Sequence, residues 1–226
     1  MVKSIIIYDL LNIMIIAFLN LKGGCGKSTS AVHLCRYLLD KQKTVALVDS
    51  DGQGTSSMWM HNLEEQIPRP SIYRINEPDP LLDSIPMMAE NFEDVVIDGA
   101  GGLAEMQRVI LLVADLVLRP IQASAPDLLA SEEMITSVRR VRRVRNGSPL
   151  AYSFLNRTIS NTLLNREAKT ALKNYQDVPL LKTEIPQRQI IADLMGQNST
   201  LWDLKGKIAR QMEKCYRQLF EEVSLG

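Results

Sequence analysis

A glycine-rich loop near the start of the chain holds the residues with the clearest chemical potential. It reads KGGCGKST over residues 22–29 and directly follows an apolar run. Glycines let the backbone turn tightly and direct its N–H groups at one point, and the start of a helix adds positive potential. Lys27 is then placed to bridge the β- and γ-phosphates of a nucleotide, and the Ser28 hydroxyl to ligand Mg²⁺. The sequence therefore predicts a phosphate-binding loop.

Three segments carry a resemblance to a known family. The loop fits K-G-G-x-G-K-[ST], and with its additional lysine, Lys22, it resembles the deviant Walker A box of the ParA/MinD family of P-loop ATPases. Residues 45–54 (VALVDSDGQG) resemble the family's second box, with a glycine in place of the usual proline. Residues 92–102 (FEDVVIDGAGG) resemble its Walker B strand and switch, with Asp98 retained. The short chain is similar to the small, plasmid-type ParA partition proteins.

The resemblance implies catalytic roles for two lysines and two aspartates. Lys27 neutralises the phosphates of its own subunit's nucleotide, whereas Lys22 reaches the partner's nucleotide in an ATP-sandwich homodimer. Asp51 takes the position of the carboxylate that orients the attacking water. Asp49 is a second acid beside the metal, and its alternative role is that of a strand-end carboxylate that caps a turn.

The resemblance also implies how ATP and Mg²⁺ are held. Ser28 ligands the metal directly and Asp98 holds it through water, while Thr29 contacts the α-phosphate. Farther along the chain, a separate set of residues resembles the family's adenine-contacting segment. The complete set predicted to bind ATP is Lys22, Gly23, Gly24, Cys25, Gly26, Lys27, Ser28, Thr29, Asn156, Pro186 and Gln187, of which the last three form the adenine-contacting segment.

An arginine-rich helix end predicts a surface for nucleic acid. Residues 139–145 contain five arginines, and on a helical wheel three of them lie opposite the apolar face while the other two return toward its edge. A solvated helix end is the alternative, because cations there gain about 0.3–1 kcal/mol from the helix dipole. The predicted contacts are Arg139, Arg140, Arg143, Arg188, Lys205 and Arg210. Binding would be independent of sequence, because nothing in the chain resembles a base-reading motif.

The elements that must position these residues follow from alternating apolar runs and helical patterns. The predicted strands are residues 13–19, 45–48, 95–97, 116–121, 152–155 and 178–185, and the predicted helices are residues 28–40, 103–112, 127–145, 163–175 and 201–223. The proline-rich residues 67–86 are predicted to form a loop. Nearly uninterrupted apolar strands are typical of sheets covered on both faces. The pattern predicts a single α/β domain over residues 13–226, a P-loop fold with a doubly wound, mostly parallel sheet and helices on both faces.

The first residues form an apolar stretch that resembles a membrane segment in composition. Residues 4–21 are rich in Ile and Leu, but three polar residues interrupt them. Each apolar block is shorter than the roughly 20 residues that a membrane helix needs. We therefore predict a buried strand from residue 13 onward and an N-terminal extension, residues 1–12, to which the sequence assigns no role. Met14 is an alternative start of the chain.

Composition and charge indicate a folded cytoplasmic protein. The 226 residues are 46% hydrophobic and 23% charged, which excludes a disordered chain. The formal net charge is zero, yet residues 1–129 carry 10 basic against 16 acidic residues, and residues 130–226 carry 16 against 10. The basic half indicates an electrostatic partner. The three cysteines are too few for a disulfide framework or a zinc site, which indicates a reducing cytosol.

Together these features predict a Mg²⁺-dependent ATPase of the ParA type that is cytoplasmic and nucleoid-associated. It would dimerise on ATP, bind DNA without sequence preference and position a cargo, either a plasmid or chromosome locus or a protein assembly, with a ParB-like adaptor. One alternative is a MinD-like membrane-cycling ATPase, although the core-facing stripe of the last helix and its acidic end argue against a membrane partner. The other is a metabolic P-loop enzyme, such as a small-molecule synthetase or an iron–sulfur reductase, although no cysteine pair is spaced to share a cluster.

Overall fold

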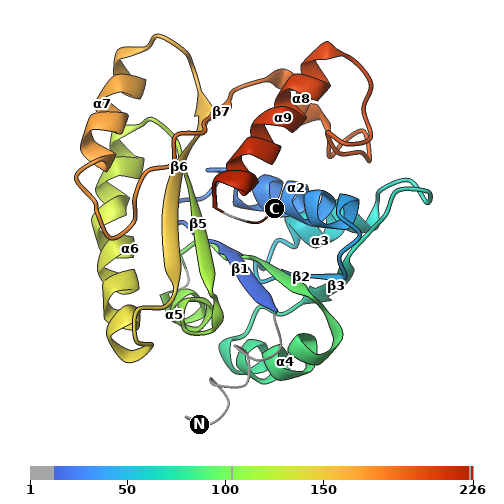
Figure 1. Cartoon of the computed structure of the whole chain (residues 1–226), viewed down its shortest axis with the longest axis horizontal. Helices are drawn as coiled ribbons and strands as arrows, with labels where there is room; N and C mark the ends of the chain where they lie inside the picture. Colours follow the sequence, from blue (N-terminus) through green and yellow to red (C-terminus); the bar gives the residue numbers. More distant parts are fainter. Residues whose placement is uncertain (1–12, 103, 224, 226) are drawn as a thin grey trace.

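The computed structural model describes residues 13–102, 104–223 and 225, and the extension predicted for residues 1–12 lies outside the described residues. In the described part of the chain, seven parallel strands form one sheet in the order β3-β2-β4-β1-β5-β6-β7 (Figure 1). The strands are β1 (Met14–Phe18), β2 (Val45–Asp49), β3 (Ser71–Arg74), β4 (Asp94–Asp98), β5 (Leu116–Ile121), β6 (Leu150–Thr158) and β7 (Ile185–Pro186). The predicted parallel α/β sheet is confirmed.

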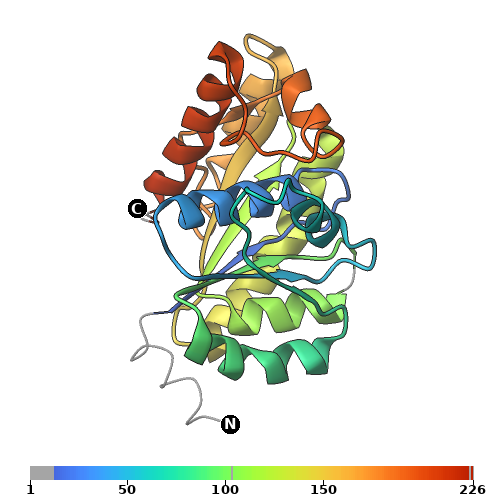
Figure 2. The same ribbon diagram turned by 90° about the vertical axis from the view of Figure 1, so that its right-hand side faces the viewer.

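Helices cover both faces of this sheet, as the sequence predicts. They are α2 (Lys27–Asp40), α3 (Thr55–His61), α4 (Pro78–Asn91), α5 (Ala104–Val113), α6 (Ala125–Val144), α7 (Leu163–Leu172), α8 (Gln189–Asp193) and α9 (Lys207–Glu222). The helices α2, α3 and α9 pack on one face, and α4, α5 and α6 on the other (Figures 1 and 2). Among the described residues, none of the helices combines the length and the apolar character that crossing a membrane requires.

The central strand β1 is buried on both faces, which explains its uninterrupted apolar sequence. Ile16 and Phe18 pack in the core beneath α2 and α9, whereas Ile15 and Ala17 pack in the core beneath α4 and α5. Successive side chains of a strand point to opposite faces, so both sets must be apolar. The apolar run thereby fixes the strand that leads directly into the glycine-rich loop.

The proline-rich segment over residues 67–86 is more ordered than the sequence predicts. It contains β3 and the first part of α4, so the predicted loop is wrong there. A proline at the start of a helix is tolerated because its missing N–H would have no helical partner in any case, and Pro78 occupies that place. Leu81, Ile85 and Met88 then form the buried face of α4.

The chain after β6 also departs from the predicted boundaries. Of the strand predicted over residues 178–185, only the two-residue β7 and one isolated bridge between Ser153 and Leu180 are present. The last helix begins at Lys207 instead of residue 201, because residues 201–203 form a turn in which Asp203 accepts hydrogen bonds from Thr200. The short α3 and α8 were not predicted, since five to seven residues carry too little periodicity.

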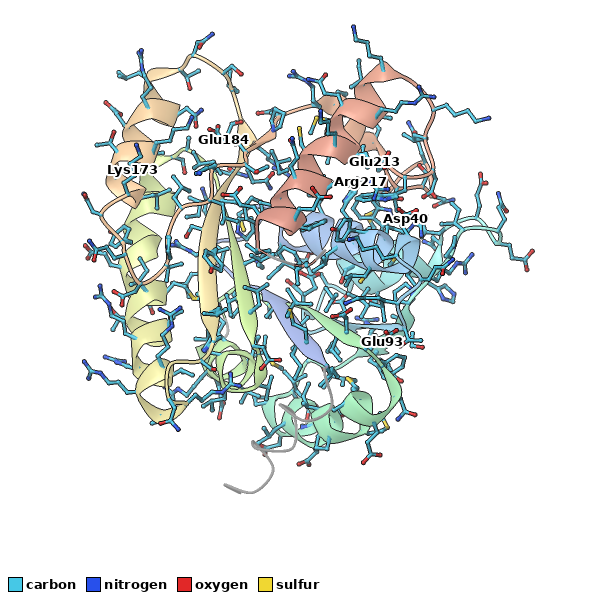
Figure 3. The ribbon with its side chains drawn as sticks, viewed as in Figure 1. Asp40, Glu93, Lys173, Glu184, Glu213 and Arg217 are labelled. Atoms are coloured by element: carbon cyan, nitrogen blue, oxygen red, sulfur yellow. The ribbon has the colours of Figure 1, made fainter. Side chains whose placement is uncertain are left out.

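Ion pairs join the C-terminal part of the chain to α2. Arg217 of α9 pairs with Asp40 at the end of α2 at 2.7 Å and with Glu213 at 2.8 Å (Figure 3). Arg36 of α2 pairs with Asp203 in the turn before α9 at 3.1 Å, and both side chains are largely buried. These contacts hold α9 against the helix that begins at the glycine-rich loop.

A buried aromatic cluster completes the contact between α2 and α9. The His33 ring stacks on Tyr216 with ring centroids 4.6 Å apart and an interplanar angle of 9°, and Trp59 and Trp202 each lie 5.8 Å from it. Its Nδ1 lies 2.6 Å from the carbonyl oxygen of Thr29, so this nitrogen carries the proton and donates it to that oxygen. Burial lowers the pKa of His33 to about 4.

We expect this histidine to make the fold less stable in mild acid. An unfolded imidazole titrates near pH 6.5, whereas His33 in the folded chain titrates near 4, so below pH 6.5 only the unfolded state gains the proton. Between pH 7.5 and pH 5, His33 should reduce the free energy of unfolding by about 2 kcal/mol. The change in unfolding free energy between the two pH values, measured with urea, should be about 2 kcal/mol less favourable in the wild type than in His33→Phe, which keeps a ring against Tyr216.

The exposed His61 supplies the matched control for this prediction. His61→Phe should retain the full pH dependence of the wild type, because it leaves the buried His33 and its surroundings unchanged. Equal losses of stability in the wild type and in His33→Phe would contradict the assignment of the pH dependence to His33.

Candidate nucleotide-binding site

The carboxyl ends of three central strands bring the predicted loop and both acidic segments to one edge of the sheet. Phe18 lies opposite Asp98 in the register of β1 and β4, and Asp49 lies opposite Asp98 in the register of β2 and β4. The connections that leave β1 and β5 run to opposite faces, with α2 on one and α6 on the other (Figure 1). A crevice between two such strands is the usual ligand site of a doubly wound sheet.

The glycine-rich loop has the geometry of a phosphate cradle. Gly24 and Gly26 have φ values of 74° and 101°, a left-handed conformation that glycine adopts without strain. The helix α2 begins at Lys27, immediately after the loop, so its unpaired N–H groups face the same space. The Lys27 side chain is largely buried, and its ammonium donates to the carbonyl oxygen of Lys22 at 3.1 Å. This hydrogen bond closes residues 22–27 into a ring, the ring of the loop, and the Lys27 ammonium lies inside it.

Asp98 at the end of β4 is a buried carboxylate suited to a divalent cation. Its side chain is fully buried, and neither oxygen accepts a hydrogen bond of good geometry from the described residues. Burial raises the pKa of Asp98 to about 7, while the nearby hydroxyls of Ser56 and Ser28 lower it. A buried carboxylate whose oxygens accept no well-aligned hydrogen bond from the described residues, beside a serine hydroxyl, offers the hard oxygen ligands that Mg²⁺ prefers. The residues present thus fit the predicted metal pair of Ser28 and Asp98.

The two acidic residues after β2 make different contacts. The carboxylate of Asp49 accepts the N–H of Asp51 at 3.1 Å and the N–H of Ser57, in the first turn of α3, at 2.8 Å. These contacts match the alternative role of Asp49 as a capping carboxylate, and its role beside a metal stays a prediction. Asp51 is half-buried in the turn, where one oxygen accepts the N–H of Gln53 at 3.0 Å. The Asp51 carboxylate thus lies in the turn after β2, at the sheet edge that also carries the glycine-rich loop.

Lys22, the additional lysine of the loop, lies outside the ring that contains Lys27. Its backbone N–H donates to the Asn20 side chain at 3.2 Å, and its ammonium donates to the Ser124 hydroxyl, after β5, at 3.3 Å. The side chain is half-buried. The two lysines of the loop therefore contact different surroundings, one inside the cradle and one beside the neighbouring strand connection.

A pocket of about 350 Å³ adjoins the start of α2. It brings Thr29 together with Asn156, Pro186 and Gln187, the residues predicted to contact the adenine ring. Its other walls come from Arg157 in β6, from α3, from residues 187–195 around α8 and from α9. They are Thr55, Trp59, Arg157, Arg188, Gln189, Ile191, Ala192, Met195 and Tyr216. No motif marks Trp59 or Tyr216 in the sequence, because only the tertiary packing of α3 and α9 brings them to the pocket.

The structure divides the predicted nucleic-acid residues into two separate groups. Arg140 and Arg143 are exposed near the end of α6, whereas Lys205 and Arg210 are exposed around the start of α9, at the opposite end of the molecule (Figures 1 and 2). Arg188 belongs with the second group and lines the pocket beside the loop.

The helix-wheel analysis of the arginine-rich end is only partly supported. Arg142 donates to the carbonyl oxygens of Pro149 and Asp177, and Arg145 pairs with Asp115 at 3.5 Å, so the two arginines near the apolar edge are structural. Arg139, however, pairs with the Asp177 carboxylate at 2.6 Å. An ion pair leaves Arg139 less able to bind phosphate than the wheel suggests.

Together, the doubly wound parallel sheet, the glycine-rich loop and the buried strand-end carboxylate define a P-loop nucleotide-binding protein. The family described as the CobQ/CobB/MinD/ParA nucleotide binding domain matches residues 16–201, and the chain belongs to this family. The predicted membership of the ParA/MinD group of ATPases is thereby confirmed.

The individual proteins similar to this chain have different roles. The chain is 27% identical over 211 residues to maintenance of carboxysome distribution protein A of Halothiobacillus neapolitanus. The aligned region covers 92% of this chain and 95% of that relative. Among solved structures, apo McdA from Cyanothece superposes with a TM-score of 0.75 at 17% identity, covering 94% of this chain and all of the other. Cobyrinic acid a,c-diamide synthase from Mycobacterium smegmatis, with an ATP analogue and magnesium bound, superposes with a TM-score of 0.72 at 17% identity, covering 94% and 96%. At such identities the superpositions establish the fold.

Proposed function

We propose that the protein is a ParA-type ATPase that positions a cargo along DNA. It binds ATP with Mg²⁺, forms a sandwich homodimer, binds DNA without sequence preference in the cytoplasm at the nucleoid, and releases DNA after hydrolysis. A ParB-like adaptor on the cargo stimulates turnover. The observation that carries the proposal is the pair of lysines in one loop, with Lys27 inside the cradle and Lys22 outside it. The likeness to a carboxysome distribution protein over almost its whole length supports a protein assembly as cargo.

The geometry of the site accounts for the reaction in these terms. Lys27 and the N–H groups of the loop neutralise phosphate charge, and Ser28 and Asp98 would hold Mg²⁺, which would supply positive charge beside the phosphate oxygens. Asp51 orients the attacking water from the edge of the site. Lys22 stabilises the transition state only in the dimer, where it reaches the partner's nucleotide in the manner of an arginine finger.

The DNA contact is assigned to the cations around α9. Arg188 lines the pocket next to the loop, and Lys205 and Arg210 are exposed on the same side of the molecule. Cations at the nucleotide edge are brought together when two subunits enclose ATP, so their affinity for DNA can depend on ATP. The exposed Arg140 and Arg143 at the far end of α6 are the alternative contact.

We expect DNA binding to depend on ATP and on salt but not on sequence. If about four phosphates are neutralised per dimer, log affinity should fall with log salt at a slope of about −3.6. A variant with Lys205→Ala and Arg210→Ala should lose most of this affinity and of the slope, because it removes two cations from each subunit. Gel shifts with ATP and with ADP, on two unrelated DNA sequences and at several salt concentrations, measure these quantities.

The matched control removes the same number of cations from the other group. Arg140→Ala combined with Arg143→Ala should leave affinity and slope close to those of the wild type. The reverse ranking of the two variants would move the contact to α6, and equal affinity with ADP and ATP would contradict the proposed cycle. Sedimentation with anionic liposomes and ATP tests the MinD-like alternative, and we expect the protein to stay in the supernatant.

A further inference from the structure

An irregularity in β6 redirects one side chain toward the glycine-rich loop. The pairing of β6 with β7 shifts register between Asn156 and Thr158, and Arg157 between them has φ 53°, a left-handed conformation uncommon for a residue with a side chain. The Arg157 side chain is exposed, whereas Asn156 and Thr158 are both buried. Such bulges change the direction in which a neighbouring side chain points, often next to a functional site.

The side chain of Asn156 bonds to the loop itself. Its Nδ2 donates to the carbonyl oxygen of Cys25 at 2.7 Å, and its Oδ1 accepts the N–H of Arg157 at 3.0 Å. The residue is 3% exposed, so the donated bond lies away from water. A Cβ added to Gly26 would lie 2.1 Å from Nδ2, so the Asn156 amide occupies the space that only a glycine leaves open.

A second amide makes the same kind of contact one peptide earlier. Gln122, directly after β5, donates through Nε2 to the carbonyl oxygen of Gly24 at 2.9 Å. In a trans peptide the C=O and N–H groups point in opposite directions. An amide that holds the carbonyl oxygen of Cys25 on one side therefore directs the N–H of Gly26 to the other side, and Gln122 does the same for the N–H of Cys25.

We propose that Asn156 is a positioning residue for the phosphate loop, which fixes the peptide between Cys25 and Gly26 so that its N–H faces the bound phosphates. This inference rests on the proposed nucleotide-binding function and deepens it. It differs from the adenine contact that the family resemblance implies for Asn156, because here the residue acts on phosphate binding through the backbone of the loop. The effect of Asn156 on affinity must then be independent of which base the nucleotide carries.

The test separates phosphate binding from base binding. Asn156→Leu keeps the side-chain volume and removes the hydrogen bond that Nδ2 donates to the Cys25 carbonyl oxygen. Titration calorimetry should show about tenfold weaker binding of Mg²⁺–ADP, of Mg²⁺–GDP and of Mg²⁺–tripolyphosphate, which has no base. The ratio of ADP to GDP affinity should stay at its wild-type value. If Asn156→Leu does not fold, Asn156→Ala removes the same donor and should give the same pattern.

Asn165→Leu is the matched control for a general loss of stability. Asn165 is a buried asparagine of α7 whose side chain donates to Glu184 at 3.2 Å, and it does not line the pocket beside the loop. This variant should lose stability, as measured by urea unfolding, and keep wild-type affinity for all three ligands. Equal loss of affinity in Asn165→Leu would reduce Asn156 to a structural residue. A change in the ADP to GDP ratio with unchanged tripolyphosphate binding would overturn the inference and restore the base contact.

These measurements use the monomer without DNA, so they are independent of the proposed positioning cycle. A wild type that binds ADP and never binds DNA would refute the cycle while leaving the role of Asn156 intact. A wild type that binds DNA on ATP, together with variants of Asn156 that bind phosphate normally, would refute only the role of Asn156.

Discussion

A Lys22→Ala variant is expected to bind ADP as tightly as the wild type and to lose ATP-driven dimerisation, stimulated hydrolysis and DNA binding together. The Lys22 ammonium lies outside the ring of the loop, next to Ser124, so its removal leaves the cradle of the same subunit intact. All three lost properties need the sandwich dimer, in which Lys22 would serve the partner's nucleotide. A positively charged group supplied by a partner in phosphoryl transfer is typically worth 10³- to 10⁵-fold in rate.

Lys27→Ala is the matched comparison within the same loop. Lys27 lies inside the ring, where its ammonium bonds the carbonyl oxygen of Lys22, so its loss should weaken nucleotide binding by the monomer itself. The loss of one charged contact to phosphate should cost about 10- to 100-fold in affinity. Calorimetry with ADP and size-exclusion chromatography with a nonhydrolysable ATP analogue distinguish the two variants. If Lys22→Ala dimerises and hydrolyses ATP normally, Lys22 is a solvated residue that ends the first strand, and the sandwich model fails.

Asp51→Ala is expected to bind ATP and dimerise but to hydrolyse ATP at least 100-fold more slowly. Orientation of the attacking water and stabilisation of its charge are typically worth 10²-fold or more, about 2.7 kcal/mol. Because release from DNA requires hydrolysis, the variant should remain on DNA as a trapped dimer. Single-turnover hydrolysis and the lifetime of the DNA complex after ATP is diluted measure the two consequences.

The neighbouring Asp49 provides the control for the Asp51→Ala variant. Asp49 accepts the N–H groups of Asp51 and Ser57, so Asp49→Asn, which keeps one oxygen, should reduce the free energy of unfolding by about 1 kcal/mol. A folded Asp51→Ala protein with wild-type turnover would move the water-orienting role to another residue.

The central part of the fold could be predicted because its signals are local. An apolar strand, the glycine-rich loop and α2 follow one another directly between Met14 and Asp40, and each needs only its own sequence to be recognised. The acidic strand ends could be predicted for the same reason, since Asp49 and Asp98 close apolar runs. Parallel pairing then brings these ends together without further information.

What could not be predicted depends on contacts between residues that are distant in the chain. The helical wheel places Arg139 on the solvent side, but it contains no information about Asp177, which the loop before β7 brings within 2.6 Å. Trp59 and Tyr216 reach the pocket through the packing of α3 and α9 against α2. The family resemblance implies a site role for Asn156, whereas its bond to Cys25 depends on a register shift at an edge of the sheet.

The order of strands in the sheet also determines when the loop can acquire its binding geometry during synthesis. The loop is translated early, but its bracing partners Gln122 and Asn156 lie 98 and 131 residues farther along the chain than the residues they hold. The strand β1 pairs with β4 and β5, which are both translated later, so its place in the sheet is completed only after they are made. Non-local pairing of this kind slows folding and exposes apolar edges in the nascent chain. The full binding geometry of the loop therefore arises only after residue 156 has been made.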